Sequence, residues 1–422
     1  MAGGRPALRR HVSRRPCRLA VLLLAAALGV TGTVAAAGAH AASDDGLEAR
    51  AEPAPIVSVP VGTPGLPRVT AAAAILLDWR TGQVLYAKNA YRPRAPASTT
   101  KILAAIVVLE NARLNEKVKV SQYAAWTPGS HMPLEPGQEL TVGELLWGIL
   151  LRSANNGCVA VAEHIAGSER AFVEMMNRRA AQLGCRKTHF RNPHGISVRN
   201  HYTTGFDLAL MARYALTLPA FETIVRTREA TLELDGGDEG LMRLSNTNRL
   251  LWTFSGAEGV KTGTTDAAGK CLVASATRNG RRLVSVVLAS ADRYADTAEL
   301  LEWGFDNFAT VRIARAGRPL ATVGVSGGLE RRVHLAPEEE FWVAVPSWTA
   351  DSLGFEVHLV EPVKAPLRRG QVVGWAEAVL GDGVVRAVNL VAADDVPVWT
   401  PERALLKGLL EVLRVLSRLG IG

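Results

Sequence analysis

The chain has 422 residues, of which 48% are hydrophobic and 21% charged, an ordinary composition for a globular protein of about two or three domains. Its formal net charge is +8, but six arginines precede the first acidic residue, Asp44: Arg5, Arg9, Arg10, Arg14, Arg15 and Arg18. Without these six the charge falls to +2, so the composition gives no support for nucleic-acid binding.

The first 41 residues have the pattern of an export signal peptide. A basic segment ends at Arg18, an apolar run covers 19–37, and Ala39-His40-Ala41 is a small-residue cleavage site. The apolar run approaches the length of a membrane span, so an uncleaved anchor is the alternative. The signal pattern predicts that the rest of the chain works outside the cytoplasm.

Residues 42–66 are rich in proline and small residues, which is typical of a linker. The folded part is expected to begin at residue 67, with strands at 72–77 and 84–87. Strand patterns recur near the end of the segment 67–311, and helical patterns lie between. This order indicates one α+β domain whose sheet joins distant parts of the chain.

The segment Ala97-Ser98-Thr99-Thr100-Lys101 leads into a long apolar run. If a helix begins near Pro96, Ser98 and Lys101 lie one turn apart on the same face. A serine needs a neighbouring base to act as a nucleophile, and a buried lysine can be that base when its amine is neutral. The helix N-terminus adds free N–H groups for an oxygen that becomes negative during acyl transfer.

Two further motifs follow. Ser153-Ala154-Asn155 falls on a loop between the helical patterns 142–151 and 159–165. Lys261-Thr262-Gly263 precedes a strand-like run at 271–276, so we expect it on an adjacent antiparallel strand. A serine followed three places later by a lysine occurs by chance about once in such a chain, whereas the three motifs in this order are rare.

These motifs supply the groups that acyl transfer needs. Ser153 can relay a proton between Lys101 and a leaving amine, and Asn155 can orient Lys101 or bind the substrate backbone. Lys261 can hold a substrate carboxylate and favour a neutral Lys101, and Thr262 can add a hydroxyl donor. The substrate is expected to lie antiparallel along this strand.

The C-terminal part of the chain has a different residue pattern. Residues 312–398 are β-rich and contain no catalytic constellation, so we expect a separate small domain. Residues 399–422 predict an amphipathic helix whose charged residues recur at helical spacing: Lys407, Glu411, Arg414 and Arg418. We expect this helix to lie in a membrane interface and to hold the protein at the outer face of the cell membrane, and packing on its own domain or on a partner is the alternative.

Three cysteines remain beyond the signal segment, namely Cys158, Cys185 and Cys271. Their odd number and spacing favour buried free thiols over a disulfide framework or a zinc site. No H-E-x-x-H motif is present either. The sequence therefore predicts chemistry without a metal or a cofactor.

With these motifs the chain resembles the serine-type D-alanyl-D-alanine carboxypeptidases, the low-molecular-weight penicillin-binding proteins. The likeness runs from about residue 72 to 419 and includes the phrases 192–195, 201–204 and 268–276. It implies a β-lactamase/transpeptidase-like domain, in which an antiparallel sheet is flanked by helices with a helical subdomain. It also implies removal of the terminal D-alanine from peptidoglycan stem peptides through a Ser98 acyl-enzyme, with β-lactams as inhibitors.

The resemblance also suggests further site residues. The backbone N–H groups of Ser98 and Thr264 would hold the oxyanion, and Arg282 occupies the position of a basic residue near the substrate's terminal carboxylate. His194 and His201 stand in family-like phrases, and we expect structural hydrogen bonds from both.

One departure from a related class bears on the activity. Ala154 stands where class A β-lactamases carry aspartate, and no E-x-x-L-N segment follows at the expected distance. Those enzymes use that glutamate to activate the deacylating water, so rapid penicillin hydrolysis is disfavoured. A β-lactamase or transpeptidase with the same site, and a non-catalytic protein that binds cell wall or β-lactams, remain the alternatives.

Overall fold

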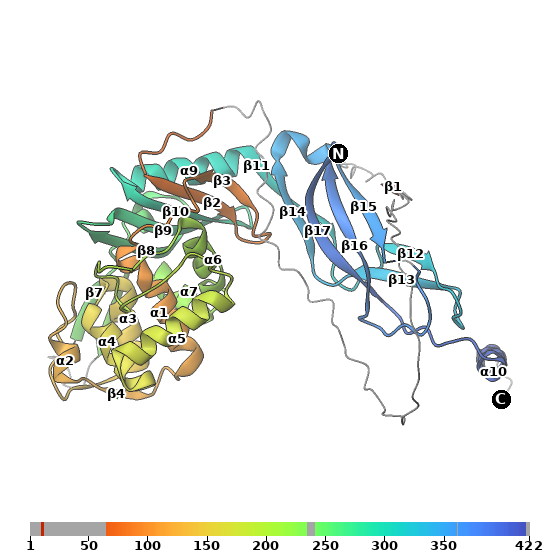
Figure 1. Ribbon diagram of the computed structural model, residues 1–422, viewed down its shortest axis with the longest axis horizontal. Coiled ribbons are helices and arrows are strands. Elements are labelled where there is room, and N and C mark those ends of the chain that lie inside the picture. Colours follow the sequence, from red (N-terminus) through yellow and green to blue (C-terminus); the bar gives the residue numbers. More distant parts are fainter. Residues whose placement is uncertain (1–9, 12–64, 234–240, 361, 419–422) are drawn as a thin grey trace, which may run out of the picture.

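The computed structural model describes residues 10–11, 65–233, 241–360 and 362–418. The expected export signal and linker lie outside the described residues, apart from residues 10–11 and 65–66. Arg10–His11 form the short strand β1. The rest forms an N-terminal domain of helices around a sheet (65–307), a β-rich C-terminal domain (308–398) and a terminal helix (Figure 1).

The N-terminal domain is built on a five-stranded antiparallel sheet in the order β3-β2-β10-β9-β8. Its strands are β2 (Ala73–Asp78), β3 (Val84–Lys88), β8 (Ala257–Thr265), β9 (Gly269–Arg278) and β10 (Arg281–Ser290). Two of these strands come from the start of the domain and three from its end. This arrangement confirms the expected α+β class and places the Lys261 motif on β8, at one edge of the sheet.

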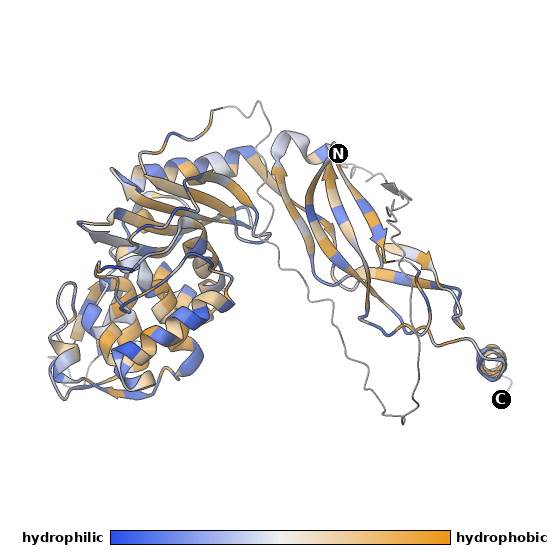
Figure 2. Ribbon diagram, in the orientation of Figure 1, coloured by the Kyte–Doolittle hydropathy of each residue, from blue (hydrophilic) through white to orange (hydrophobic). Residues whose placement is uncertain are grey.

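Both faces of this sheet are buried because successive side chains of a strand point to opposite sides. Along β2, Ile75 and Leu77 join one hydrophobic core, while Ala74 and Leu76 join the other. The first core is shared with the helical region, and the second is covered by α9 (Arg293–Asn307). The sheet is therefore a rigid layer between two helical layers (Figure 2).

The helical region lies between β3 and β8 in the chain. Its helices are α1 (Lys101–Asn111), α2 (Gln122–Ala125), α3 (Val142–Trp147), α4 (Asn155–Ala166), α5 (Glu169–Gln182), α6 (Gly205–Ala215), α7 (Pro219–Arg226) and α8 (Leu250–Thr253). Two small hairpins accompany them, β4 (Lys117–Lys119) with β5 (Glu139–Thr141) and β6 (Glu229–Glu233) with β7 (Leu241–Ser245). Helix α1 is buried over its first eight residues, so it forms the centre of this region.

The C-terminal domain begins with β11 (Phe308–Ala314), which pairs with β14 (Phe341–Pro346). A six-stranded sheet follows in the order β1-β15-β16-β17-β13-β12. Its other strands are β12 (Ala321–Gly324), β13 (Arg332–Pro337), β15 (Leu353–Leu359), β16 (Val372–Leu380) and β17 (Gly383–Ala392). The domain has its own hydrophobic core, and the expected boundary after residue 311 falls inside β11.

Side-chain hydrogen bonds connect the two domains directly. The buried amide of Gln83 accepts a hydrogen bond from Ala344 N at 2.7 Å and donates to Ala344 O at 3.3 Å. Thr310 Oγ1 also donates to Asp78 Oδ2 at 2.6 Å. Both contacts lie on the side of the sheet that carries β2 and β3, so they leave the β8 edge free.

The terminal helix α10 spans Pro401–Arg418 and buries no residue. Leu405 is 78% exposed and Leu409 56%. Among the described helices none is by itself long and apolar enough to cross a bilayer. Helices α6 and α7 pass on length and composition only as a pair, and that pair is bent by 108°.

Candidate active site

The candidate nucleophile lies on a tight turn at the start of α1. Residues Ala97–Thr100 form a 3-10 turn, and Ala97 has a left-handed φ of 49°. Gly263 of β8 packs so closely that a Cβ there would lie 2.8 Å from Ser98 N. A Cβ at Gly195 would overlap the Ala97 carbonyl group. Two glycines therefore let β8 and the loop 192–199 close on the Ser98 turn.

Lys101 lies beside Ser98 and is completely buried. Its Nζ is 3.1 Å from Ser98 Oγ and donates to Asn155 Oδ1 at 2.7 Å and to His194 O at 2.6 Å. Burial lowers the pKa of Lys101 to about 8. In the neutral amine the two N–H groups are taken by the two carbonyl oxygens, so the lone pair faces the Ser98 hydroxyl.

Asn155 is held in the orientation that this arrangement requires. Its Nδ2 donates to Pro128 O at 2.7 Å, which leaves Oδ1 to face Lys101. Its backbone N–H donates to Ser130 O at 2.6 Å. The segment 128–130 therefore fixes the amide and, through it, the lysine.

Ser153 lies two residues earlier, where a π-helical turn (148–152) ends. It has left-handed dihedrals (φ 67°, ψ 32°) and is buried. Within the described part of the chain its hydroxyl has no hydrogen-bond partner. The structure thus leaves Ser153 Oγ without a bond to Ser98 or to Lys101, and the expected proton relay stays a prediction.

Lys261 is the second buried lysine, with 1% of its surface exposed. Its Nζ donates to Thr262 O at 3.3 Å, and Thr262 Oγ1 is bonded to Thr247 Oγ1 at 2.8 Å. Burial lowers the pKa of Lys261 well below its ordinary value, and the nearby charge of Lys101 lowers it further. A positive charge on Lys101 therefore disfavours a positive charge on Lys261.

Thr264 follows on the same strand and is exposed. Because β8 is the last strand of the sheet, its outer backbone groups are not paired with another strand, and the Ser98 turn packs against it. The backbone N–H groups of Ser98 and Thr264, expected to hold the oxyanion, thus belong to two segments that are in contact.

The structure places Arg282, which was expected near the substrate's terminal carboxylate, away from the other candidate site residues. Arg282 is opposite Thr277, next to the hairpin turn and level with the start of β8. Its guanidinium donates to Glu258 Oε2 at 2.8 Å and is paired with Glu222. Two carboxylates therefore already occupy it, at the end of β8 away from Thr264.

Sequence reasoning missed a different arginine, Arg293. It is the first residue of α9, and its Nη1 donates to Gly263 O at 2.8 Å and to Cys271 O at 3.0 Å. It is close enough to lower the pKa of Lys261. The signal was Asp292, whose side chain caps the helix by accepting from Tyr294 N and Ala295 N.

His194 and His201 make the structural hydrogen bonds expected of them. His201 Nδ1 accepts from Arg191 N at 3.1 Å, so its Nε2 carries the proton and donates to Thr100 Oγ1 at 3.0 Å. Burial lowers the pKa of His201 to about 3, which keeps it neutral. His194 Nδ1 accepts from Ile196 N, and its Nε2 lies 3.5 Å from Glu169 Oε1.

The thiols agree with the sequence prediction. Cys158, Cys185 and Cys271 are free and buried. Burial raises the pKa of the Cys158 thiol to about 11, although both lysines act against this shift. Among the described residues no group of histidine, cysteine, aspartate or glutamate side chains is arranged to hold a metal ion.

The site has a buried lysine within hydrogen-bond distance of a serine at the start of a helix, and both face an edge strand that carries a second lysine. This arrangement defines a serine acyl-transfer enzyme of the Ser-Lys type. The chain matches the family model for D-alanyl-D-alanine carboxypeptidase over residues 61–292 and that for the penicillin-binding protein 5 C-terminal domain over 308–398. It belongs to the D-alanyl-D-alanine carboxypeptidase family.

Individual relatives agree with this assignment. The chain is 34% identical over 334 residues to the D-alanyl-D-alanine carboxypeptidase DacF of Bacillus subtilis, covering 77% of this chain and 85% of the relative. It is 35% identical over 348 residues to DacC of Escherichia coli, with 78% and 85% covered.

Solved structures show the same likeness. Penicillin-binding protein 5 from Haemophilus influenzae superimposes with a TM-score of 0.73 at 30% identity, covering 79% of this chain and 99% of that chain. The Streptomyces K15 DD-transpeptidase gives 0.55 at 34% identity, covering 57% and 99%. These comparisons confirm the family resemblance, the fold class and the activity, a serine-type D-Ala-D-Ala carboxypeptidase.

The close contact at Gly195 makes a testable prediction. In Gly195→Ala the new Cβ meets the Ala97 carbonyl and displaces the Ser98 turn. We expect labelling by a fluorescent penicillin to slow by about 100-fold, as a misplacement of about 1 Å does. Gly184→Ala is the matched control, because Gly184 also has a positive φ (83°) but its Cβ meets only Leu210 Cδ1 at 3.9 Å. Thermal unfolding midpoints show whether both variants are folded. If the midpoints are equal and Gly195→Ala is labelled as fast as Gly184→Ala, the prediction is contradicted.

Proposed function

We propose that Ser98 is the nucleophile of this carboxypeptidase and that Lys101 is its general base. The observation that carries the proposal is the hydrogen-bond set of Lys101, which aims a lone pair at Ser98 Oγ. The amine takes the hydroxyl proton while Oγ attacks the carbonyl carbon of the penultimate D-alanine. The backbone N–H groups of Ser98 and Thr264 stabilise the oxyanion.

Collapse of the tetrahedral intermediate then breaks the peptide bond. The proton on Lys101 passes to the leaving amine through Ser153 Oγ, so that D-alanine departs and the acyl group stays on Ser98. Water attacks the ester, gives its proton to Lys101, and the shortened peptide leaves as Ser98 regains its proton. The unpartnered, buried hydroxyl of Ser153 supports the relay, since a bound substrate amine would supply the missing partner.

The terminal carboxylate of the substrate is held at β8. Lys261 supplies the cation, Thr262 a hydroxyl, and Arg293 a second positive charge behind the strand. In the free enzyme the proximity of Lys101 disfavours the charge on Lys261. A bound carboxylate raises the pKa of Lys261 again, and the restored charge favours the neutral form of Lys101.

The products of two substrates test the assignment of Ser98. With a D-Ala-D-Ala peptide we expect free D-alanine from the wild-type protein and none from Ser98→Ala. After brief exposure to benzylpenicillin we expect a mass adduct on the peptide that contains Ser98. We expect slow release of the opened drug, because the sequence lacks the E-x-x-L-N segment whose glutamate activates the deacylating water in class A β-lactamases. D-alanine release by Ser98→Ala, or an adduct on another serine, would overturn the assignment.

The pH dependence of acylation tests Lys101. Because the base must be neutral, the second-order acylation rate of benzylpenicillin should rise about tenfold per pH unit below the Lys101 pKa of about 8 and level off above it. Arginine cannot give up its proton, so Lys101→Arg should lose at least about 1,000-fold at every pH tested. The control is Lys119→Arg, which replaces an exposed lysine on β4 and should keep the wild-type pH profile. A pH-independent rate between pH 6 and 9 would rule out this base.

We also propose that the protein is exported and held on the outer face of the membrane by α10. The large apolar side chains of this helix are exposed, including Leu409 and Leu413 at i, i+4 spacing. Charged residues alternate with them, and Lys407 is paired with Glu330 of the C-terminal domain. A helix with this pattern lies in the headgroup region and buries its apolar side in lipid.

Vesicle binding tests this attachment. The chain without its first 41 residues should sediment with phosphatidylglycerol vesicles, and Leu409→Asn/Leu413→Asn should reduce the bound fraction at least about tenfold. Leu114→Asn, at an exposed leucine of the N-terminal domain, serves as the control. Equal binding of both variants would show that α10 does not mediate attachment.

A further inference from the structure

Unpaired cations gather on one surface of the N-terminal domain. We call this surface the basic strip, and its exposed members are Arg92, Arg186, Lys187, Arg191 and Arg199. None of these five side chains has an ion pair with another residue that the structure describes. The reaction steps proposed above use none of them, so the function of this charge is unassigned.

The sequence around the basic strip contains no acidic residue. Neither 79–109 nor 175–206 includes an aspartate or a glutamate. Asp207 follows directly, but it is buried, and its Oδ2 accepts from Lys187 N at 2.9 Å and from Thr188 Oγ1 at 2.7 Å. This carboxylate is used inside the fold, so the positive charge at the surface is not compensated by it.

Two segments of the basic strip form a short ribbon. An antiparallel bridge joins His189 to Tyr202, with backbone hydrogen bonds of 2.9 Å in both directions. Successive side chains of an extended segment point to opposite sides. Phe190 is completely buried in the core, whereas Lys187 and Arg191 are exposed. The inner side of the ribbon therefore belongs to the core, and the two cations project from its outer side.

A third segment brings Arg92 to the same surface. Lys187 Nζ lies 3.5 Å from the carbonyl oxygen of Tyr91, the residue before Arg92. Arg94, two residues further on, pairs with Thr203 of the ribbon through a second antiparallel bridge. Arg92 is therefore held next to Lys187, at one end of the basic strip.

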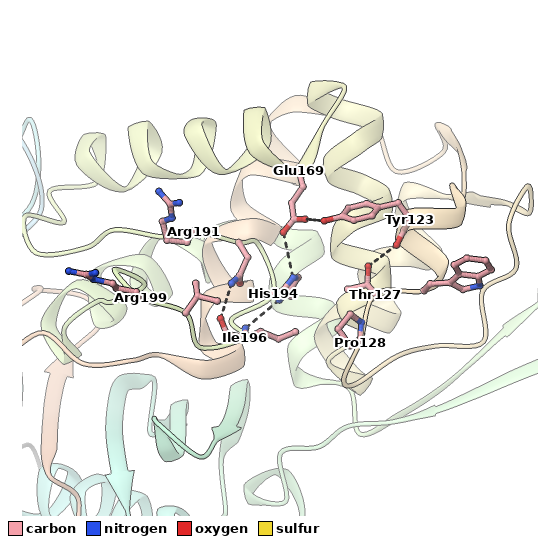
Figure 3. A pocket seen from close by; sticks show the side chains of 11 residues that line it. Tyr123, Thr127, Pro128, Glu169, Arg191, His194, Ile196 and Arg199 are labelled. Carbon is pink, nitrogen blue, oxygen red and sulfur yellow. Dashed lines mark hydrogen bonds and ion pairs between the residues drawn. The ribbon is translucent and has the colours of Figure 1, made fainter.

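The other end of the basic strip borders a cavity of about 630 Å³ (Figure 3). Arg191 and Arg199 line this end of the cavity, and their guanidinium groups point away from Tyr123 and Glu169 (Figure 3). Glu169 is already used, since it accepts from Tyr123 Oη at 2.8 Å and lies 3.5 Å from His194 Nε2. The His194 carbonyl accepts from the catalytic lysine, so the basic strip begins at the rim of the active site and extends away from it.

Aromatic rings lie among the cations. The ring centroids of His189 and Tyr202 are 6.1 Å apart, and Tyr91 and Tyr202 are each 37% exposed. An extended chain spans about 13 Å from residue 187 to residue 191, which is more than one small anion covers. A surface of this length, with rings between cations, fits a polymer that alternates anionic groups with uncharged units.

We propose that the basic strip binds an anionic cell-wall polymer whose units are joined by phosphodiesters. Each unit of such a polymer carries a permanent negative charge, and the planar fork of arginine matches phosphate oxygens. A lipid surface fits less well, because α10, the proposed membrane helix, lies at the opposite end of the molecule from the helical region (Figure 1). The proposal depends on the proposed export and not on the roles of Ser98 and Lys101.

Binding of a labelled polymer tests this proposal. The chain without its first 41 residues should bind fluorescein-labelled poly(glycerol phosphate), and its affinity should fall as salt rises because the polymer releases counterions on binding. Arg92→Gln/Arg186→Gln/Lys187→Gln should raise the Kd at least about tenfold. It should also reduce the slope of log K against log salt by about 2, since three phosphate contacts are lost.

A second triple variant is the matched control. Arg113→Gln/Lys119→Gln/Arg170→Gln removes three exposed cations elsewhere on the same domain, so it changes the net charge equally. Its Kd for the polymer should change less than about twofold, because charges farther away than the Debye length are screened. Hydrolysis of a D-Ala-D-Ala peptide should be unchanged in both triple variants, which also shows that both are folded.

Three outcomes would overturn the proposal. The first is equal loss of polymer binding in the two triple variants, which would show that only the net charge matters. The second is equal affinity of the wild-type protein for poly-L-glutamate of the same length, which would show that phosphate is not recognised. The third is loss of binding to phosphatidylglycerol vesicles in the basic-strip variant alone, which would identify lipid headgroups as the ligand. In each case the proposed function stands, because peptide hydrolysis is measured separately.

Discussion

The buried amine of Lys101 is the constraint on which the rest of the site depends. A charged ammonium has a high desolvation cost in an apolar interior, so the chain either neutralises it or surrounds it with acceptors. Here the two carbonyl acceptors come from distant segments, the start of α4 and the loop 192–199, and Ser98 lies one turn before the lysine. Burial therefore lowers the pKa of Lys101, and the hydrogen bonds of its amine connect these segments.

Close packing on both sides of Ser98 is the second constraint. The sheet holds β8 firmly because β9, which pairs with it, and β10, the next strand, have long runs of buried residues. Gly263 then lets this edge approach the Ser98 backbone, and Gly195 does the same from the opposite loop. Any side chain at either position would meet backbone atoms, which cannot move as the end of a flexible side chain can. The two glycines therefore allow β8 and the loop 192–199 to approach the Ser98 turn closely.

The sequence predicted those parts of the site that depend on local spacing. Ser98 and Lys101 are one turn apart, and the strand-like run at 271–276 predicted an adjacent strand that carries Lys261. Strand register separates Arg282 from the other site residues, because Arg282 lies beside a hairpin turn on β10, level with the start of β8, whereas Thr264 lies near the end of β8. Arg293 reaches the site through the packing of α9 on the sheet. The cavity lined by Pro128 and by Arg191 and Arg199 likewise forms between segments that are far apart in the sequence. Local patterns carry no information on such long-range placement. The signal peptide, the domain boundaries and the membrane attachment stay predictions.

The two lysines explain why a free terminal carboxylate matters to such a site. Without an anion, Lys101 and Lys261 compete for positive charge inside one buried volume, and burial disfavours the charge on both. Under the proposed roles, a carboxylate at β8 stabilises the charge on Lys261 and leaves Lys101 free to act as the base. A peptide that continues beyond the second alanine brings no such charge to β8. Under these roles the substrate completes the charge balance of the site, and a preference for a chain end with a free carboxylate follows from that balance.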